Sequence, residues 1–182
     1  MAPKPLVMLN ELITSKTRLR LLIKFFISQA NSGYLNGLAT EMGESTNAIR
    51  KELNHLFDAG YLKKIKKNNK VEYTVNSGHP MYEVLRKVVL KHLGMADIVE
   101  NVLERMGAVK EIILVGDYAL GHDSGNIEVF LIGQQLNMDY ISNLEKKIET
   151  LIKRKVRFYL ANQFISRQKH LILFKQEGIS PL

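Results

Sequence analysis

The segment from Leu35 to Val75 constrains the fold more than any other part of this chain, because several structural signals follow one another within it. A short helical pattern comes first, from about Asn36 to Met42, and Gly43 ends it. Polar residues that can cap a second helix follow at once, and a lysine-rich hairpin completes the segment. The pattern therefore predicts two helices joined by a tight turn and followed by a small hairpin.

The second helix, expected from Ser45 to Asp58, has one apolar and one polar face. Its apolar residues recur at three- and four-residue spacings and should be buried: Ile49, Leu53, Leu56 and Phe57. The residues that should face outward are Ser45, Thr46, Asn47, Arg50, Lys51 and Asn54. Asn and Arg can form bidentate hydrogen bonds with base edges in the major groove of DNA, and Thr and Lys also suit phosphates. An ordinary solvated surface helix could carry the same residues, so the helix alone leaves both interpretations open.

The hairpin that follows concentrates positive charge. Tyr61–Ile65 and Val71–Val75 are strand-like, and Asn68-Asn69 should form the turn between them. Five lysines lie in or beside these strands, namely Lys63, Lys64, Lys66, Lys67 and Lys70. Like charges this close repel one another, and a phosphate backbone would relieve that repulsion. We therefore expect contact with nucleic acid, with a solvated loop as the alternative.

The run LATEMGESTNAIRKELNHLFDAGYL and the hairpin after it resemble the winged helix-turn-helix of ArsR- and MarR-like bacterial regulators. The resemblance covers roughly residues 10–76. It implies that the helix at Ser45–Asp58 is a recognition helix, that the lysine hairpin is a wing and that double-stranded DNA is the partner. A single module of this size has limited affinity and reads few base pairs, so we expect a homodimer on a pseudo-palindromic site. Metal sensing through ArsR-type cysteine sites is not implied, because the chain has no cysteine.

Helical patterns flank this segment on both sides. Leu9 to Ala30 should form one helix with a single apolar stripe, made of Leu12, Leu19, Leu22, Ile23, Phe26 and Ile27. Residues 79–106 should form two helices separated by Gly94, with a first stripe of Met81, Val84, Leu85, Val88 and Val89 and a second of Met95, Ile98, Val99, Val102 and Leu103. We expect residues 1–78 to be the DNA-binding domain and residues 79–106 a helical connector that packs on the domains or on a partner helix.

Residues 107–182 should form a separate small α/β domain, which makes the whole chain an α+β protein. The expected strands are Val109–Val115, Ile127–Ile132, Val156–Ala161 and His170–Phe174, and the expected helix is Met138–Arg154 with Leu144, Ile148, Leu151 and Ile152 on its buried side.

The connection LVGDYALGHDSGNIEVFLIG resembles the small nucleotidyltransferases, in which a Gly-Ser turn is followed by an Asp-x-Asp pair that holds Mg²⁺. Gly116 keeps the glycine, but Asp117 stands at the serine position and Asn126 at the first metal carboxylate. Glu128 can fill the second, and no acid occurs in residues 156–161, where the third is expected. We therefore expect a degenerate nucleotide site at Gly116, Asp117, Asn126 and Glu128, with no catalytic residue, metal or cofactor, that serves sensing or dimerisation.

Composition and charge agree with this division of roles. The first 80 residues contain 12 Lys and Arg against 6 Asp and Glu, whereas the remaining residues contain 14 against 12. A polyanion should therefore meet mainly the first half. No apolar run approaches the roughly 20 residues that span a bilayer, and we expect a cytoplasmic protein without a membrane partner. The interpretation that follows is a DNA-binding transcriptional regulator controlled by an unknown nucleotide or protein effector. The alternative is a Mg²⁺-dependent nucleotidyltransferase that modifies a protein or small molecule, with Asp117 or Asp123 assisting Glu128.

Overall fold

The computed structural model describes residues 8–177 of the chain. The described residues form two compact units that divide between His92 and Leu93. Together they make a mixed α+β protein, as the sequence predicts.

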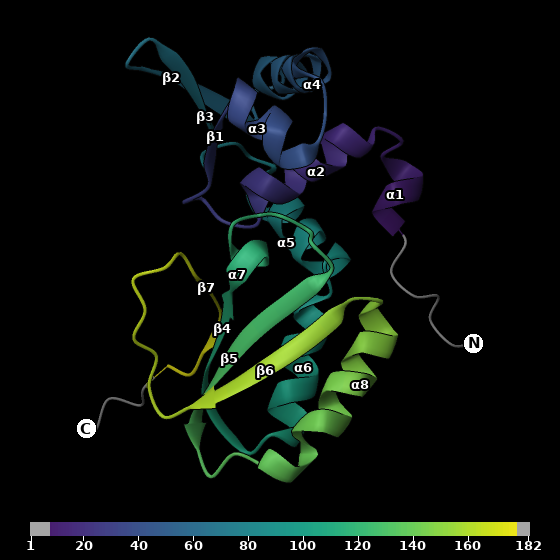
Figure 1. The fold of residues 1–182 in the computed structure, drawn as a ribbon, viewed down its shortest axis with the longest axis vertical. Helices are drawn as coiled ribbons and strands as arrows, with labels where there is room; N and C mark the ends of the chain where they lie inside the picture. Colours follow the sequence, from purple (N-terminus) through teal and green to yellow (C-terminus); the bar gives the residue numbers. More distant parts are fainter. Residues whose placement is uncertain (1–7, 178–182) are drawn as a thin grey trace. The chain divides into compact units, whose positions relative to one another are not determined.

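The N-terminal unit consists of helices around a small antiparallel sheet (Figure 1). Its three-stranded sheet has the order β1-β3-β2, with both pairs antiparallel. The elements in chain order are α1 (Met8–Leu12), α2 (Lys16–Phe26), β1 (Ser32–Tyr34), α3 (Leu35–Met42), α4 (Thr46–Asp58), β2 (Leu62–Lys67), β3 (Lys70–Val75) and α5 (Tyr82–His92). This succession of helix, strand, two helices and a hairpin is the winged helix-turn-helix arrangement.

The core of this unit forms where α2 packs against α4 and α5. Leu21, Phe25, Ile49 and Leu53 are completely buried there. Each such apolar side chain contributes about 1.5–3 kcal/mol when it leaves water. This burial fixes α4 on the unit and leaves its polar face outside.

The expectation of a single helix from Leu9 to Ala30 is wrong. The chain forms two helices, because the Ser15 hydroxyl accepts a hydrogen bond from the Arg18 N–H at 3.1 Å and caps α2. Leu12, placed in the apolar stripe, is 79% exposed. Strand β1 was not predicted. Gly33 in it pairs with Tyr73, and a Cβ at Gly33 would lie 2.6 Å from the Leu38 side chain, so only glycine fits.

The expected second helix and hairpin are confirmed. Ser45 caps α4 by accepting a hydrogen bond from the Ala48 N–H at 3.1 Å. Asn68 and Asn69 have positive φ of 48° and 58°, as a two-residue hairpin turn requires. One residue of the apolar stripe differs, since Phe57 is 36% exposed and its ring lies under the amino group of Lys64.

The apolar stripe expected on α5 is only partly buried. Val89 is buried, but Met81, Val84 and Val88 are exposed. Tyr82 takes the core position instead, with its ring 5.8 Å from that of Phe26. A large aromatic side chain therefore sets the rotation of α5, and the aliphatic residues lie at its outer side.

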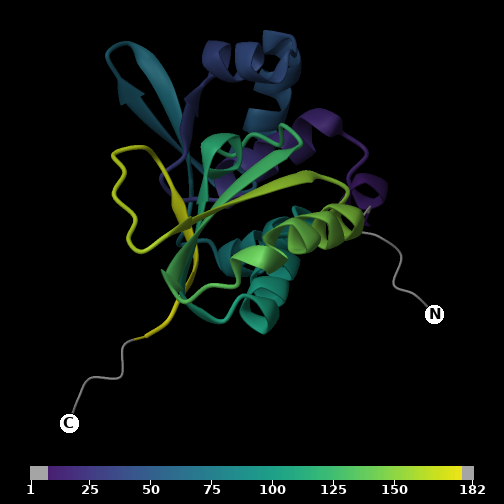
Figure 2. The same ribbon diagram turned by 60° about the horizontal axis from the view of Figure 1, so that its bottom comes forward.

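The C-terminal unit is a four-stranded sheet with the order β6-β5-β4-β7 and helices on one face (Figure 2). Strand β4 runs antiparallel to β5 and β7, whereas β5 and β6 are parallel and joined through α8. The elements are α6 (Met95–Arg105), β4 (Ala108–Val115), α7 (Gly116–Ala119), β5 (Asn126–Gln134), the 3-10 helix η1 (Met138–Tyr140), α8 (Ile141–Ile152), β6 (Lys155–Ala161) and β7 (Leu171–Lys175).

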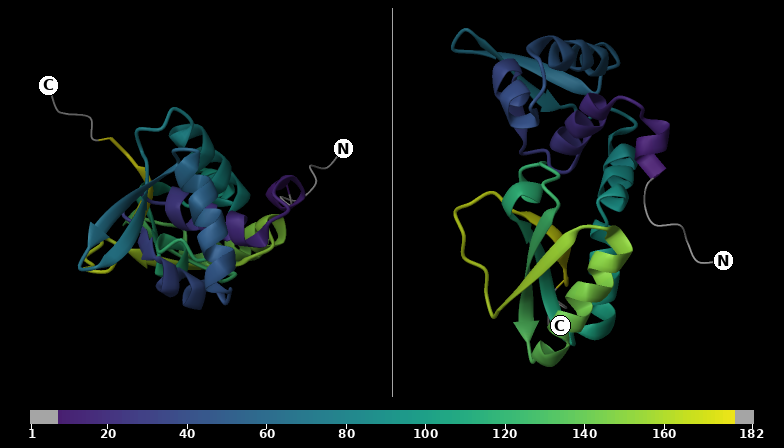
Figure 3. Two further views of the ribbon diagram at one scale, coloured as in Figure 1. Left: turned by 90° about the horizontal axis from the view of Figure 1, so that it is seen from above. Right: turned by 45° about the vertical axis from the view of Figure 1, so that its right-hand side comes forward.

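Helices α6 and α8 lie side by side on the same face of the sheet (Figure 3). Alternate residues of β5, including Ile127, Val129 and Leu131, are buried, while Glu128 and Phe130 belong to the opposite face. Strands β4, β5, β6 and β7 confirm the four strands that are expected from the sequence. The expected helix at Met138–Arg154 is shorter, because residues 138–140 form a 3-10 turn and Lys153 adopts a left-handed conformation that ends α8.

Candidate nucleic-acid interface and degenerate nucleotide site

The polar face of α4 is presented to solvent by the tight turn between α3 and α4. Gly43 ends α3 with a φ of 64°, and the Ser45 cap begins α4 two residues later. The side chains expected to contact DNA from this helix are all exposed, namely Ser45, Thr46, Asn47, Arg50, Lys51 and Asn54. The structure therefore brings all six to one end and one side of a single helix.

Two of these residues contact each other. The Arg50 Nη1 donates a hydrogen bond to the Asn47 Oδ1 at 3.2 Å. Burial raises the pKa of Tyr73 in β3, and the positive charge of Arg50 opposes that rise. A pair that projects several N–H donors in this way suits the acceptor atoms of a base edge.

The pleat of the wing divides its lysines between two faces. Lys64 and Lys66 lie two and four residues after the buried Leu62, so all three project from the same face of the hairpin. Helix α4 packs against this face. The opposite face carries Lys63, Lys67 and Lys70, with the last two directly opposed. The sequence predicts the cluster but not this division, which means that one phosphate backbone cannot lie against all five at once.

The wing lysines also differ in their partners. The Lys64 Nζ lies 3.9 Å from the centroid of the Phe57 ring, a cation–π contact that ties the wing to α4. The Lys67 Nζ lies 3.9 Å from the Glu72 Oε2. Within the described part of the chain, Lys66 has neither kind of partner, so its charge is fully available to a polyanion.

A partly buried carboxylate anchors α4 to α2. The Arg18 Nε donates to the Glu52 Oε2 at 2.7 Å, and the Ser15 Oγ donates to the Glu52 Oε1 at 2.9 Å. Burial alone would raise the pKa of Glu52, but these hydrogen bonds outweigh it and hold the pKa below its ordinary value. The sequence gives no signal for this contact, since 34 residues separate Arg18 from Glu52.

In the C-terminal unit, Gly116, Asp117, Asn126 and Glu128 lie where β4 ends and β5 begins. Gly116 has a φ of 67°, and a Cβ there would lie 2.5 Å from the Glu128 Oε2. The Glu128 Oε1 accepts a hydrogen bond from the Tyr159 hydroxyl at 3.0 Å, which raises the pKa of Tyr159. One oxygen of Glu128 therefore has a protein hydrogen-bond donor, and the other lies close to the backbone of Gly116.

Strand register adds a residue that sequence reasoning missed. Glu128 in β5 is the register partner of Arg157 in β6, and both residues line the same open pocket, so a cationic residue stands where the third acid is expected. The lack of an acid in residues 156–161 is visible in the sequence, but its replacement by Arg157 at this point is a property of the parallel register.

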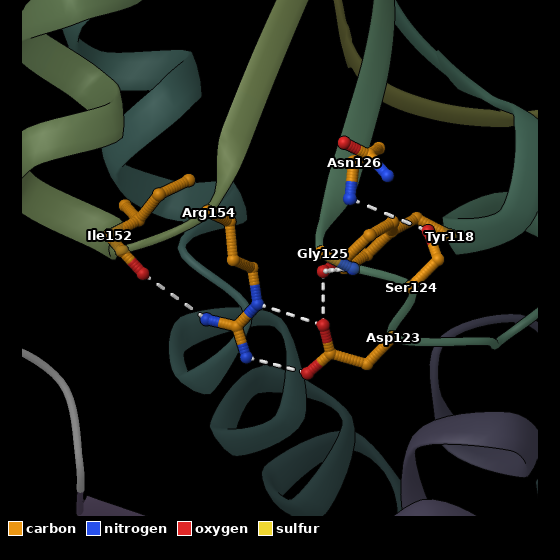
Figure 4. Close-up of polar contacts among 7 residues, drawn as sticks. All are labelled: Tyr118, Asp123, Ser124, Gly125, Asn126, Ile152 and Arg154. Carbon is orange, nitrogen blue, oxygen red and sulfur yellow. Dashed lines mark hydrogen bonds and ion pairs between the residues drawn. The ribbon is translucent and has the colours of Figure 1, made fainter.

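Asp123, the acid expected as a substitute metal ligand, instead forms an ion pair with Arg154 (Figure 4). Its Oδ1 accepts from the Arg154 Nε at 2.9 Å and its Oδ2 accepts from the Arg154 Nη2 at 2.7 Å. The Tyr118 hydroxyl also donates to Asp123 and accepts from the Gly125 N–H at 3.2 Å. Burial, together with the contact to Asp123, raises the pKa of Tyr118 far above its ordinary value. The cluster fastens the loop before β5 to the loop between α8 and β6.

Among the described residues, no three His, Asp or Glu side chains converge in a way that could hold a metal ion. No helix in residues 8–177 is long and apolar enough to cross a membrane.

No protein-family model and no curated protein matches the chain. Among solved structures, the chain is similar to reduced HlyU from Vibrio cholerae, with 19% identity and a TM-score of 0.37 over 46% of this chain and 82% of that one. The antimony-specific transcriptional repressor AntR has 21% identity and a TM-score of 0.38 over 50% of this chain and 77% of that one. Wild-type MarR from E. coli in its apo form has 15% identity and a TM-score of 0.38 over 54% of this chain and 72% of that one.

Proposed function

We propose that this chain is a DNA-binding transcriptional regulator whose α4 reads base edges and whose wing holds phosphates. The observation that carries the proposal is the fully exposed polar end of α4 beside a lysine hairpin in one compact unit. Asn47 and Arg50 are assigned to base edges, because both can form bidentate hydrogen bonds. Ser45, Thr46, Lys51 and Asn54 are assigned to phosphates or flanking bases, together with the wing lysines Lys63, Lys64, Lys66, Lys67 and Lys70.

The test first selects the preferred sequence from a randomised DNA library and then measures affinities by fluorescence anisotropy. Arg50→Ala should weaken binding to the selected sequence by about 1–3 kcal/mol and binding to random DNA much less, because base contacts carry specificity. Lys51→Ala is the matched control on the same helix and should weaken both DNAs to a similar extent. Equal losses on both DNAs from Arg50→Ala would remove its reading role.

A homodimer is part of the proposal, and α5 is the helix that would serve it. Met81, Val84 and Val88 form an exposed aliphatic stripe along it, and a second copy of the same helix would cover that stripe. Val84→Glu should shift the mass measured by light scattering from dimer to monomer. Lys87→Glu, also an exposed residue of α5, is the control. A monomer in the unchanged chain would refute this part.

We further propose that the C-terminal unit is a nucleotidyltransferase-like domain without transferase activity, used for sensing or assembly. The order β4-α7-β5-α8-β6 and the parallel β5–β6 pair support the fold resemblance. Arg157 beside Glu128 and the ion pair of Asp123 support inactivity, because neither Asp123 nor a third acid is available to help Glu128 hold hard cations.

A further inference from the structure

Two aromatic side chains on the sheet face that α6 and α8 do not cover, and two in the connection between β6 and β7, form a row of rings in contact. The rings of Phe130 and Tyr159 stack with centroids 5.1 Å apart and an interplanar angle of 28°. Phe164 follows at 5.2 Å from Phe130, and His170 at 5.0 Å from Phe164. A sheet face that meets water is expected to be polar. An accessible row of rings therefore indicates a surface that receives another flat group.

A pocket opens beside the two middle rings of this row, Phe130 and Phe164. The connection between β6 and β7, the yellow-green loop at the left of Figure 1, lines a cavity of about 440 Å³ together with residues of β4 and β5. The lining residues are Val115, Phe130, Gln163, Phe164, Ile165, Ser166 and Gln168. This volume falls in the range of roughly 300–1,000 Å³ that small-molecule sites occupy.

The lining selects for an uncharged ligand. None of the described residues around the cavity is charged, so an ion that entered would lose hydration without gaining a partner. The side-chain amides of Gln163 and Gln168 make no hydrogen bond to any other described residue, and each offers both donors and an acceptor. The Ser166 Oγ accepts from the Gln168 N–H at 3.0 Å, which orders the segment that carries these groups.

We propose that this pocket binds an uncharged planar heteroaromatic ring of the kind found in nucleosides. The ring would lie against Phe130 and Phe164, and the amides of Gln163 and Gln168 would select its polar edge. Stacking on aromatic rings supplies affinity for any of the bases, whereas side-chain amides can discriminate between hydrogen-bond donors and acceptors on the edge of the bound ring. The proposal goes beyond DNA binding and does not depend on it, because binding can be measured in the absence of DNA.

The test uses the full chain with adenosine, guanosine, cytidine and uridine as probes. Saturation-transfer NMR should show stronger transfer to base protons than to ribose protons for at least one nucleoside. Calorimetry should then give a Kd of about 1 mM or tighter. Transfer to none of the four would overturn the proposal, and so would a tenfold preference for AMP over adenosine, because the pocket offers a phosphate no cation.

Variants separate this pocket from binding elsewhere. Phe164→Leu keeps an apolar side chain but removes the ring, and it should weaken the best nucleoside about tenfold. Phe57→Leu makes the same exchange on α4 and should leave nucleoside binding unchanged. Gln163→Ala and Gln168→Ala change exposed residues, so they remain informative if Phe164→Leu fails to fold, and each should weaken binding severalfold. Unchanged affinity in the folded pocket variants would refute the assignment.

Discussion

Two sites, one in each unit of this chain, use charged side chains in different ways. On α4 and the wing, cations such as Lys51 and Lys66 extend into water. In the C-terminal unit, Asp123 and Arg154 are half-buried and pair with each other through two hydrogen bonds. A charge held in water is available to phosphates, whereas a buried charge that loses its partner is costly. The first pattern suits the proposed contact with a polyanion, and the second supports the fold.

Asp123→Asn should have the largest effect on stability, because it leaves the guanidinium of Arg154 without its counter-charge in a site where only 14% of that side chain is exposed. We expect the C-terminal unit to lose about 2–3 kcal/mol, less than a fully buried pair would, because the side chain of Asp123 is 26% exposed. Urea unfolding followed by circular dichroism measures the loss.

The matched control for that change is Lys155→Ala, which removes an exposed ion pair with Glu149 in the same unit. Its cost should stay below about 0.5 kcal/mol. If the two variants were equally stable, the ion pair between Asp123 and Arg154 would not stabilise the loop before β5. The contrast between a supporting ion pair and solvent-exposed charges would then be wrong.

Glu52 sharpens the comparison, because it is a paired charge within the N-terminal unit. Its folded-state pKa is depressed below the ordinary 4.5. Its stabilisation is therefore fully present above the unfolded pKa and is lost as pH falls through the lower folded value. Glu52→Gln should cost about 1–2 kcal/mol at pH 7. The unfolding free energy of this variant should also fall less steeply than that of the parent below pH 4.5.

The control for Glu52 is Glu44→Gln, which alters the exposed ion pair between Arg20 and Glu44 at 3.3 Å. This variant should follow the pH dependence of the parent. A parent-like pH profile in Glu52→Gln would show that the contact with Arg18 does not support α4.

Substitutions of the wing lysines test the solvent-exposed charges of the N-terminal unit. Lys66→Gln should weaken binding to any DNA sequence and reduce the slope of log K against log salt by about 0.9, the value for one lost phosphate contact. Lys64→Gln should reduce the slope less, because the amino group of Lys64 is engaged by the Phe57 ring. Anisotropy titrations between 50 and 200 mM salt, conditions spanning roughly the range over which such contacts weaken, measure both. Equal slopes for the two variants would mean that the contact between Lys64 and the Phe57 ring does not reduce the contribution of Lys64 to DNA binding.

The parts of the molecule that follow local rules could be predicted from the sequence. Ser45 and the Asn68-Asn69 turn act on neighbouring residues, so α4 and the wing were expected close to their observed bounds. The interruption at Ser15 was missed because the apolar spacing continues across it, although serine is itself a capping signal. Strand β1 is three residues long and exists because the edge of β3 is free to pair with it.

The candidate nucleotide site could be predicted only in part. Asn126 and Glu128 are visible as departures from a motif, but the neighbour of Glu128 depends on the register between β5 and β6. In the same way, Asp123 and Arg154 are 31 residues apart and meet only when α8 has crossed over the sheet. Interactions of this kind are set by tertiary packing, so single-sequence patterns cannot reveal them.

The smallest expected effect belongs to Glu128→Gln. In an active transferase this change would abolish label transfer from ATP and Mg²⁺, because a metal carboxylate would be lost. Here one oxygen accepts from Tyr159, the other lies against Gly116, and Arg157 is the neighbour in β6. We expect no transfer from either the parent or the variant and a stability change below about 1 kcal/mol. The prediction would be contradicted if the parent transferred label, Glu128→Gln abolished that transfer and Tyr159→Phe retained it. Glu128 would then be a working metal ligand in this unit. The charges of this unit would then serve a ligand, as is proposed for those of the wing, and the contrast between the two sites would fail.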